Sequence, residues 1–431
     1  MRPETRNSVI LVLGTGTTAV LSLAYCVYAG RRLGPTGGYA DFTAALAFAS
    51  FCNIALGPIN GTIAKFSAGY AARGEYGKVR SIYREAAKRM ALYGFVVFAL
   101  AALAAGPVAE ALNFRSTASL MIACAMVYLT LLVSVGRGVL RGVQSFGAYN
   151  LNIVAEATIR LALGVAIFAL LRTAVAGLSA YILALLATLT LICGQLRGAW
   201  RGHDCEPLNG AAIRRFVAPM FVMMGVSAGF ENIDLLFVKH YFGELEAGIY
   251  GSAFILARAI SVVATPFQLL LLPLVAGLYE QGRPLGRTFG RICVYFALLA
   301  AGPLLLFWLC SEGIVAGLYG PAYHGAAPLL LPLGLTRLVG YLSAMIALFY
   351  ASMGRFGFLG VYVPGLILQA AALTLWHTSL STVVVTVLIV QTAALAGMVA
   401  HLIQGRRSRR RESTSRIQVD HAAECRPWRD D

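Results

Sequence analysis

The sequence predicts an all-α polytopic membrane protein with about 12 transmembrane helices in two six-helix lobes around a central cavity. Of its 431 residues 58% are hydrophobic and only 13% are charged, whereas a soluble domain is about 25% charged. A dozen apolar stretches have roughly the 20-residue length that crosses the hydrocarbon core. Because lipid offers the backbone no hydrogen-bond partner, such stretches must be helices.

Each expected span is a mainly apolar stretch bounded by polar, glycine-rich or proline-containing residues. A short basic segment precedes the first, whose apolar run is too long for a signal peptide. The spans are 8–30, 40–66, 89–112, 116–137, 150–171, 175–197, 213–238, 249–275, 289–310, 326–350, 357–377 and 381–403.

Positive charge orients these spans. Of the 35 Lys and Arg residues, 26 fall in the termini and in the loops after even-numbered spans, and five fall in the other loops. Lys and Arg are retained in the cytoplasm, so both termini are expected there. This topogenic charge accounts for the net charge of +16. A nucleic-acid partner is therefore not needed to explain that charge.

The connecting segments are short, and only the 67–88 and 198–212 loops are larger. Residues 74–90 favour a basic amphipathic helix, which either lies on anionic lipid or is a solvated connector. The polar tail 404–431 begins with a basic run and is expected to be disordered. The lack of a large outer loop argues against a membrane enzyme that builds its site outside the bilayer.

Two internal echoes divide the chain into halves. LGPTGGY (33–39) and FGELEAGIY (242–250) both follow an odd-numbered span, and QSFGAY (144–149) and GRFGFL (354–359) both follow an even-numbered one. In each case the offset is six spans, so the halves are expected to be parallel repeats with substrate at their interface. The predicted units are a lobe over 1–200, a second lobe over 201–403 and the tail 404–431.

Enzyme motifs occur only in unsuitable contexts. Residues 225–229 match the nucleophile-elbow pattern and 9–19 match a dinucleotide fingerprint. Both lie inside predicted spans rather than at a strand–turn–helix junction. No paired metal-ligand or cysteine spacing is found. We therefore predict a protein that is not an enzyme, with no catalytic residue, no metal and no cofactor.

Ionisable residues inside the predicted spans indicate the functional site. A charge at the bilayer centre costs about 2.5–3.5 kcal/mol on insertion scales, so it normally faces a partner or a wet cavity. Arginine suits a phosphate group because its planar fork donates two parallel hydrogen bonds. We predict a cationic, substrate-binding cavity formed by Arg31, Arg32, Lys65, Arg160, Arg258 and Arg337.

Some of these residues also have a structural interpretation, in which they do not bind substrate. Glu156 and Arg160 are four residues apart, so they share a helix face and either bind substrate or form a structural ion pair. Lys65 either joins the cavity or extends to the inner interface. Glu231 and Asp234 lie three apart on one face and would repel each other unless one is protonated or a cation lies between them. They are the candidates for coupling to Na⁺ or H⁺.

At these residues the chain resembles a known family. GRRLGPTGGYADFTAALAF (30–48) is similar to the segment that closes span one in the oligosaccharide-lipid flippases of polysaccharide biosynthesis, a branch of the multidrug/oligosaccharidyl-lipid/polysaccharide exporter superfamily. Residues 138–164, with Glu156 and Arg160, and residues 233–257, with Asp234, resemble two further stretches of that family. The doubled Arg31–Arg32 departs from the family pattern and leaves open which arginine has the family role.

The resemblance implies two lobes that open alternately and a polyprenyl-diphosphate-linked oligosaccharide or polysaccharide repeat unit as cargo. It also implies the bacterial inner membrane as location, with membrane lipids and glycan-assembly enzymes as partners. A cation-coupled multidrug exporter of the same superfamily is the alternative, and the cationic bias of the predicted cavity argues against it. A membrane-embedded polysaccharide polymerase or ligase and a non-transporting scaffold are further alternatives.

Overall fold

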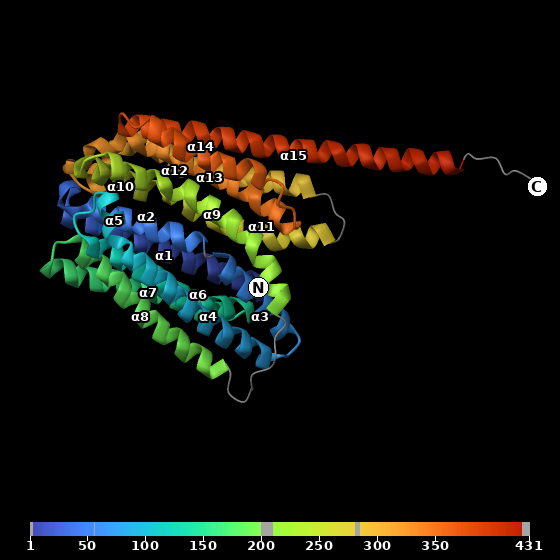
Figure 1. Ribbon diagram of the computed structural model, residues 1–431, viewed down its shortest axis with the longest axis horizontal. Helices are drawn as coiled ribbons and strands as arrows, with labels where there is room; N and C mark the ends of the chain where they lie inside the picture. The colour runs from blue at the N-terminus through green and yellow to red at the C-terminus, as the bar shows by residue number, and fades with distance from the viewer. Residues whose placement is uncertain (1–2, 56, 200–209, 281–284, 425–431) are drawn as a thin grey trace, which may run out of the picture.

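The helices form two side-by-side bundles, an N-lobe and a C-lobe (Figure 1). The computed structural model describes residues 3–55, 57–199, 210–280 and 285–424, and no strand occurs in these ranges. The N-lobe contains α1 (Pro3–Leu33), the π-helix η1 (Pro35–Tyr39), α2 (Ala40–Ala55), α3 (Gly57–Ala72), α4 (Tyr76–Leu103), α5 (Ala105–Ala111), α6 (Thr117–Gly142), α7 (Phe146–Leu170) and α8 (Ala174–Ala199).

The C-lobe has the same number of spans. It contains α9 (Gly210–Tyr241), α10 (Glu244–Ala257), α11 (Ala259–Glu280), α12 (Leu285–Leu318), the 3₁₀-helix η2 (Pro321–Ala326), α13 (Ala327–Ser352), α14 (Leu359–Leu375) and α15 (Leu380–Glu424). Nine helices within the described residues are long and apolar enough to cross a membrane, and the bent pair α2–α3 makes a tenth. With α1 and the shorter apolar α14, the twelve predicted spans are all helical.

Several spans differ from simple straight helices, among them α12, which has a non-helical residue at Cys310. α2 and α3 meet at an angle of 42°, beside Pro58, whose ring cannot continue a helix without a clash and a lost hydrogen bond. Span eight breaks at Arg258 into α10 and α11. α4 joins the basic 74–90 segment to span three in one continuous helix, and its first turns are partly buried through Gly77, Val79 and Ile82.

The C-terminal tail differs from its expected form. The sequence predicts disorder over 404–431, but α15 continues to Glu424, and residues 425–431 lie outside the described part. The segment 406–424 contains neither glycine nor proline, so nothing in it stops a helix that the preceding span has already nucleated.

The repeat echoes have structural counterparts. Gln144 and Gly354 both adopt positive φ, at 58° and 69°. The next amide donates five residues back in each case, from Ser145 to the Leu140 carbonyl (2.9 Å) and from Arg355 to the Tyr350 carbonyl (3.0 Å). This is the same αL helix stop in both halves.

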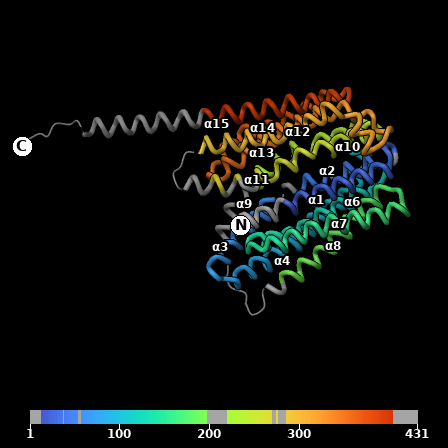
Figure 2. The backbone as a smooth tube through the Cα atoms, turned by 180° about the vertical axis from the view of Figure 1, so that it is seen from behind, coloured from blue at the N-terminus to red at the C-terminus, as the bar shows by residue number. Residues whose placement is uncertain are grey.

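The two copies of the first echo, 33–39 and 242–250, contact each other. Gly248 of α10 packs directly on the Pro35 carbonyl of η1, and Gly251 packs on Thr43 of α2. α2 also lies along α9, and one hydrophobic cluster contains residues of both lobes. The lobes therefore meet at the end opposite the chain termini, here called the closed end, and diverge toward the termini (Figures 1 and 2).

The lipid-facing surface is concentrated on equivalent helices of the two halves. Large exposed apolar side chains are frequent on α4, such as Val97 and Leu100, and on α12, such as Leu298 and Trp308. Both helices are the third span of their half. Exposed apolar patches of this size need an apolar solvent, which agrees with a multi-pass membrane protein.

We predict that the α3–α6 contact tolerates no side chain at Gly142. A Cβ there would lie 2.5 Å from the Cβ of Ser67 and 2.7 Å from the Ala64 carbonyl oxygen, which is helix backbone. Overpacking of this kind costs about 1–3 kcal/mol, so Gly142→Val should lower the melting temperature of the detergent-solubilised protein. The matched control is Gly147→Val, where a Cβ meets no atom within 4 Å; equal losses for both variants would contradict the packing.

Candidate functional site

Two arginines of the N-lobe share one carboxylate. The Glu156 carboxylate on α7 lies 2.6 Å from Arg137 Nη2 of α6 and 3.2 Å from Arg160 Nη1, one turn along its own helix. Arg137 Nε also donates to Asn152 Oδ1 at 2.7 Å. All three charged side chains are at most 15% exposed, so this group holds a positive charge that no carboxylate of the cluster neutralises.

Arg160 is held from three sides. Its Nη2 donates to Ser22 Oγ of α1 at 2.5 Å, and its guanidinium lies 4.5 Å from the ring centroid of Tyr181 on α8, a cation–π geometry. Its Nε is buried and has no hydrogen-bond partner among the described residues. A buried donor without an acceptor is costly, so this nitrogen is suited to donate to a ligand oxygen.

The C-lobe has a second, more balanced cluster. Arg337 Nη2 of α13 lies 3.6 Å from Asp234 Oδ2 of α9, and the Tyr250 hydroxyl donates to the same oxygen at 2.8 Å. Arg337 Nη1 donates to the Glu231 backbone carbonyl. The guanidinium packs over the Phe254 ring at 4.5 Å. Arg337 is therefore the cation paired with Asp234, and protonation or ion binding at Glu231 and Asp234 stays a prediction.

Arg258 lies between the two clusters. It caps α10 at the break before α11 and is half-buried. The helices on either side of it, α10 and α11, both contact α1 of the N-lobe and α13 of the C-lobe. Among the residues that the structure describes, the Arg258 side chain makes no hydrogen bond or ion pair, so it is a cation at the lobe interface that lacks a counterion of its own.

The combined site is cationic. It contains four arginines against three acids, so its formal charge is +1, and the members come from four helices and the α10–α11 break. The arginines are Arg137, Arg160, Arg258 and Arg337, and the acids are Glu156, Glu231 and Asp234. A positive site with low-dielectric walls attracts anions.

The other predicted cations lie elsewhere. Arg31 and Arg32 are exposed at the closed end, where Arg31 Nε donates to the Leu318 carbonyl at 2.5 Å and Arg32 Nε donates to the Tyr28 hydroxyl at 3.0 Å. Lys65 is exposed in the middle of α3. In this conformation none of them joins the central cluster, so their role as substrate ligands stays a prediction.

Sequence reasoning missed Arg137 because the predicted span four ends at this residue, so its charge was counted with the loop that follows. α6 continues to Gly142, which carries Arg137 into the bundle. A signal was available, since residues 138–140 are apolar or small and the next turn residues begin only at Gln144. The predicted Glu156–Arg160 pair is present, but Arg137 makes it a triad.

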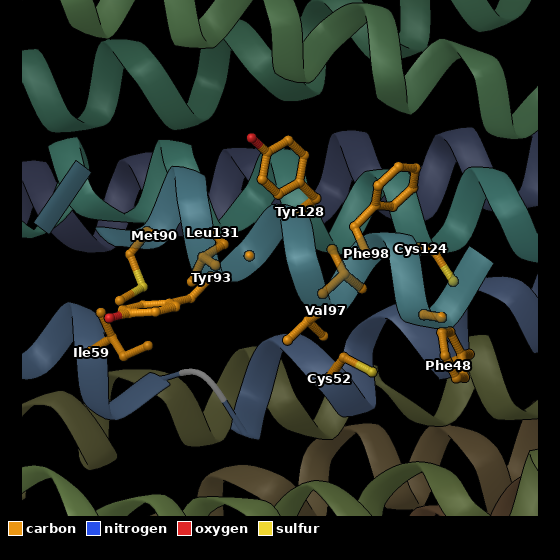
Figure 3. Close-up of a pocket in the computed structure, with 13 residues that line it drawn as sticks. Phe48, Cys52, Ile59, Met90, Tyr93, Val97, Phe98, Cys124, Tyr128 and Leu131 are labelled. Carbon is orange, nitrogen blue, oxygen red and sulfur yellow. The ribbon is translucent and has the colours of Figure 1, made fainter. Parts of the chain in front are cut away.

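A lateral apolar groove of about 250 Å³ indents the N-lobe between the α2–α3 bend, α4 and α6. Figure 3 shows Cys52 and Ile59 on one side of it and Met90, Tyr93 and Val97 near the other. The lining contains no charged residue, so the groove suits hydrocarbon and not a headgroup.

Residues 5–278 match the protein family described as "Polysaccharide biosynthesis protein". That range is more than half of the 431 residues. The chain belongs to this family. No curated protein sequence matches the chain.

The chain also has the fold of several solved structures. The chain is similar to "Inward-facing conformation of a multidrug resistance MATE family transporter of the MOP superfamily", with 13% identity, a TM-score of 0.70, and 93% of this chain and 98% of that chain covered. It is also similar to "Crystal structure of MATE in the straight conformation", with 14% identity, a TM-score of 0.69 and 93% and 95% covered.

A third similar structure is described as "Reverse polarity of binding pocket suggests different function of a MOP superfamily transporter from Pyrococcus furiosus Vc1 (DSM3638)". It has 14% identity, a TM-score of 0.62, and 92% and 95% of the two chains covered. At these identities the likeness establishes the fold alone. Family and fold together make the chain a multi-pass membrane transporter.

We predict that Glu156 is required to bury the two N-lobe arginines. Removing one partner of a buried ion pair costs about 3–5 kcal/mol, because the remaining charge lacks compensation. Glu156→Gln should therefore strongly lower the unfolding temperature in detergent, and adding Arg137→Met should recover part of the loss. Glu85→Gln is the control, since its pair with Arg89 is about half exposed and such pairs contribute little. A stable Glu156→Gln protein would contradict the triad.

Proposed function

We propose that the protein is a flippase that moves polyprenyl-diphosphate-linked oligosaccharide or polysaccharide repeat units across the bacterial inner membrane by alternating access. The observation that carries this proposal is the excess of positive charge inside the two lobes, where the two clusters and Arg258 together set four arginines against three acids. A headgroup with a diphosphate is the anionic part of such a cargo, and the family's connection with polysaccharide synthesis agrees with it.

The arginines still have donors for a phosphate. Nε of Arg160 and Nε and Nη2 of Arg337 are buried without a hydrogen bond in the described part of the chain, and Arg258 has no counterion of its own. A guanidinium binds phosphate oxygens through parallel charge-assisted hydrogen bonds. The diphosphate would satisfy these donors and add the negative charge that the cluster lacks.

The same cluster disfavours the drug-exporter alternative. A cationic drug needs an acidic pocket, but two of the three acids of this site are already paired, Glu156 with two arginines and Asp234 with Arg337 and Tyr250. The similar drug transporters share only the fold at 13–14% identity.

In the proposed orientation both termini face the cytoplasm, as the distribution of Lys and Arg predicts. The structure diverges toward that side (Figure 1), which suits loading from the cytoplasmic leaflet. In this proposal the polyprenyl chain stays in lipid during transfer, and the lateral groove beside α4 gives hydrocarbon a contact surface next to the bent α2–α3 pair. Glycan-assembly enzymes would deliver and receive the cargo.

Arg258 provides the sharpest test. Losing one charged hydrogen bond costs about 1.5–3 kcal/mol, so Arg258→Gln should reduce flipping at subsaturating cargo at least about tenfold. Flipping is measured in proteoliposomes as the loss of a labelled lipid-linked oligosaccharide from the leaflet where it was loaded. Arg172→Gln is the matched control, because Arg172 is exposed in the connection between α7 and α8 and belongs to neither cluster. Unchanged flipping by Arg258→Gln would overturn the proposed function.

We also propose that Glu231 and Asp234 couple transport to a Na⁺ or H⁺ gradient. An ion that binds these acids competes with Arg337, so coupling would act by releasing that arginine. In the double variant Glu231→Gln/Asp234→Asn, an imposed gradient of either ion should no longer accelerate flipping, while the control Glu110→Gln, exposed on α5, should keep the response. A double variant that still responds to the gradient would exclude this role.

A further inference from the structure

The closed end contains a buried ion pair between the lobes. Lys239 Nζ at the end of α9 lies 2.7 Å from Asp41 Oδ1 at the start of α2, and both side chains are 2% exposed. The second oxygen, Asp41 Oδ2, accepts a hydrogen bond from the Arg115 backbone amide at 3.0 Å. The ammonium also lies 5.6 Å from the Phe114 ring centroid. Each charge is thus compensated, as a buried pair requires.

A second layer of contacts surrounds this pair. The Arg115 guanidinium donates to both carboxylate oxygens of Glu244 on α10 and to the Thr36 carbonyl. Asn113 Nδ2 donates to the His240 carbonyl at 2.7 Å. The α5–α6 connection of the N-lobe therefore contacts the end of α9 and the start of α10. These outer contacts are partly exposed and weak individually.

A third layer is aromatic. The Tyr39 and Tyr319 hydroxyls lie 2.9 Å apart, and the Tyr323 hydroxyl donates to the Gly30 carbonyl at 2.9 Å. Arg31 donates to the carbonyls at the end of α12. All three contacts cross between the lobes, so the closed end cannot open unless the ion pair separates with them.

We propose that the Asp41–Lys239 ion pair is a latch that sets the equilibrium between the conformation described here and one that is open at the closed end. A buried pair gains Coulomb energy but loses hydration, and these terms are of similar size. When the lobes separate, both ions regain water, so the intact pair can open and close at moderate cost. This inference rests on the two-lobed transporter fold and not on the identity of the cargo.

The latch can be tested by comparing a variant that removes one charge of the ion pair with a variant that removes both. With Asp41 neutralised, Lys239 is a buried charge without a counterion in the closed state only, because in the open state it faces water. Asp41→Asn should therefore favour opening, and Asp41→Asn/Lys239→Met, which buries no charge, should restore closure. The Asn side chain keeps an acceptor for the Arg115 amide in both variants.

The experiment measures the distance between the lobes in the full-length protein. Spin labels are attached through an encoded keto amino acid at Glu110 and Leu245, which are exposed on opposite lobes at the closed end, so the native cysteines remain. Pulsed electron–electron resonance in proteoliposomes then reports the closed and open populations. We expect Asp41→Asn to raise the open-to-closed ratio at least about tenfold, and the double variant to return it close to that of the unsubstituted chain.

The control is Arg89→Ala, which removes an exposed ion pair within the N-lobe and should leave the distances unchanged. If Asp41→Asn lowers only the melting temperature and the distance distribution stays the same, the pair is structural and the latch is wrong. If the double variant is as open as the single one, charge compensation is not the cause. Neither readout depends on flipping, so failure of the proposed cargo would not affect the result.

Discussion

The arrangement of this protein depends on one constraint: an ion inside a hydrocarbon layer needs a partner. A lone charge there is expensive, and the chain places most of its buried charges in contact with an opposite charge on another helix. Glu156 joins α6 to α7, Asp234 joins α9 to α13, and Asp41 joins α2 to α9. These pairs fix helix register where leucine and alanine surfaces alone would permit sliding. Arg258 is the exception at the interface, and it lies at a helix break.

Much of the fold could be predicted from the sequence because the membrane imposes simple rules. Span length and apolar composition located the twelve spans, although not the short helices or the breaks within them, and family and fold comparison agree with the superfamily suspected from short motifs. The basic segment before span three and the tail were less predictable. Both are polar, and whether a polar segment continues a neighbouring helix depends on the absence of a stop signal rather than on its own periodicity.

The site was predicted less completely, for a different reason. Intramembrane position identified Arg160, Arg258 and Arg337, but it cannot show which side chains share a partner. Arg137 was counted with a loop because span four was predicted to end at residue 137, whereas α6 continues to Gly142. Asp41 and Lys239 each lie at the edge of a span, where a single charge is unremarkable in sequence; only the crossing of α2 and α9 reveals that they meet. Pairing between distant segments has no signal in one sequence.

The contact between η1 and α10 shows how far the two halves have diverged. In a symmetric pair of identical chains, residue i meets j and j meets i. Here a proline carbonyl in one copy meets a glycine in the other, and the Arg137–Glu156–Arg160 triad belongs to one half alone. Two lobes within a single polypeptide need not be self-complementary. Their contact surfaces differ, so two copies of the N-lobe would not reproduce the η1–α10 contact.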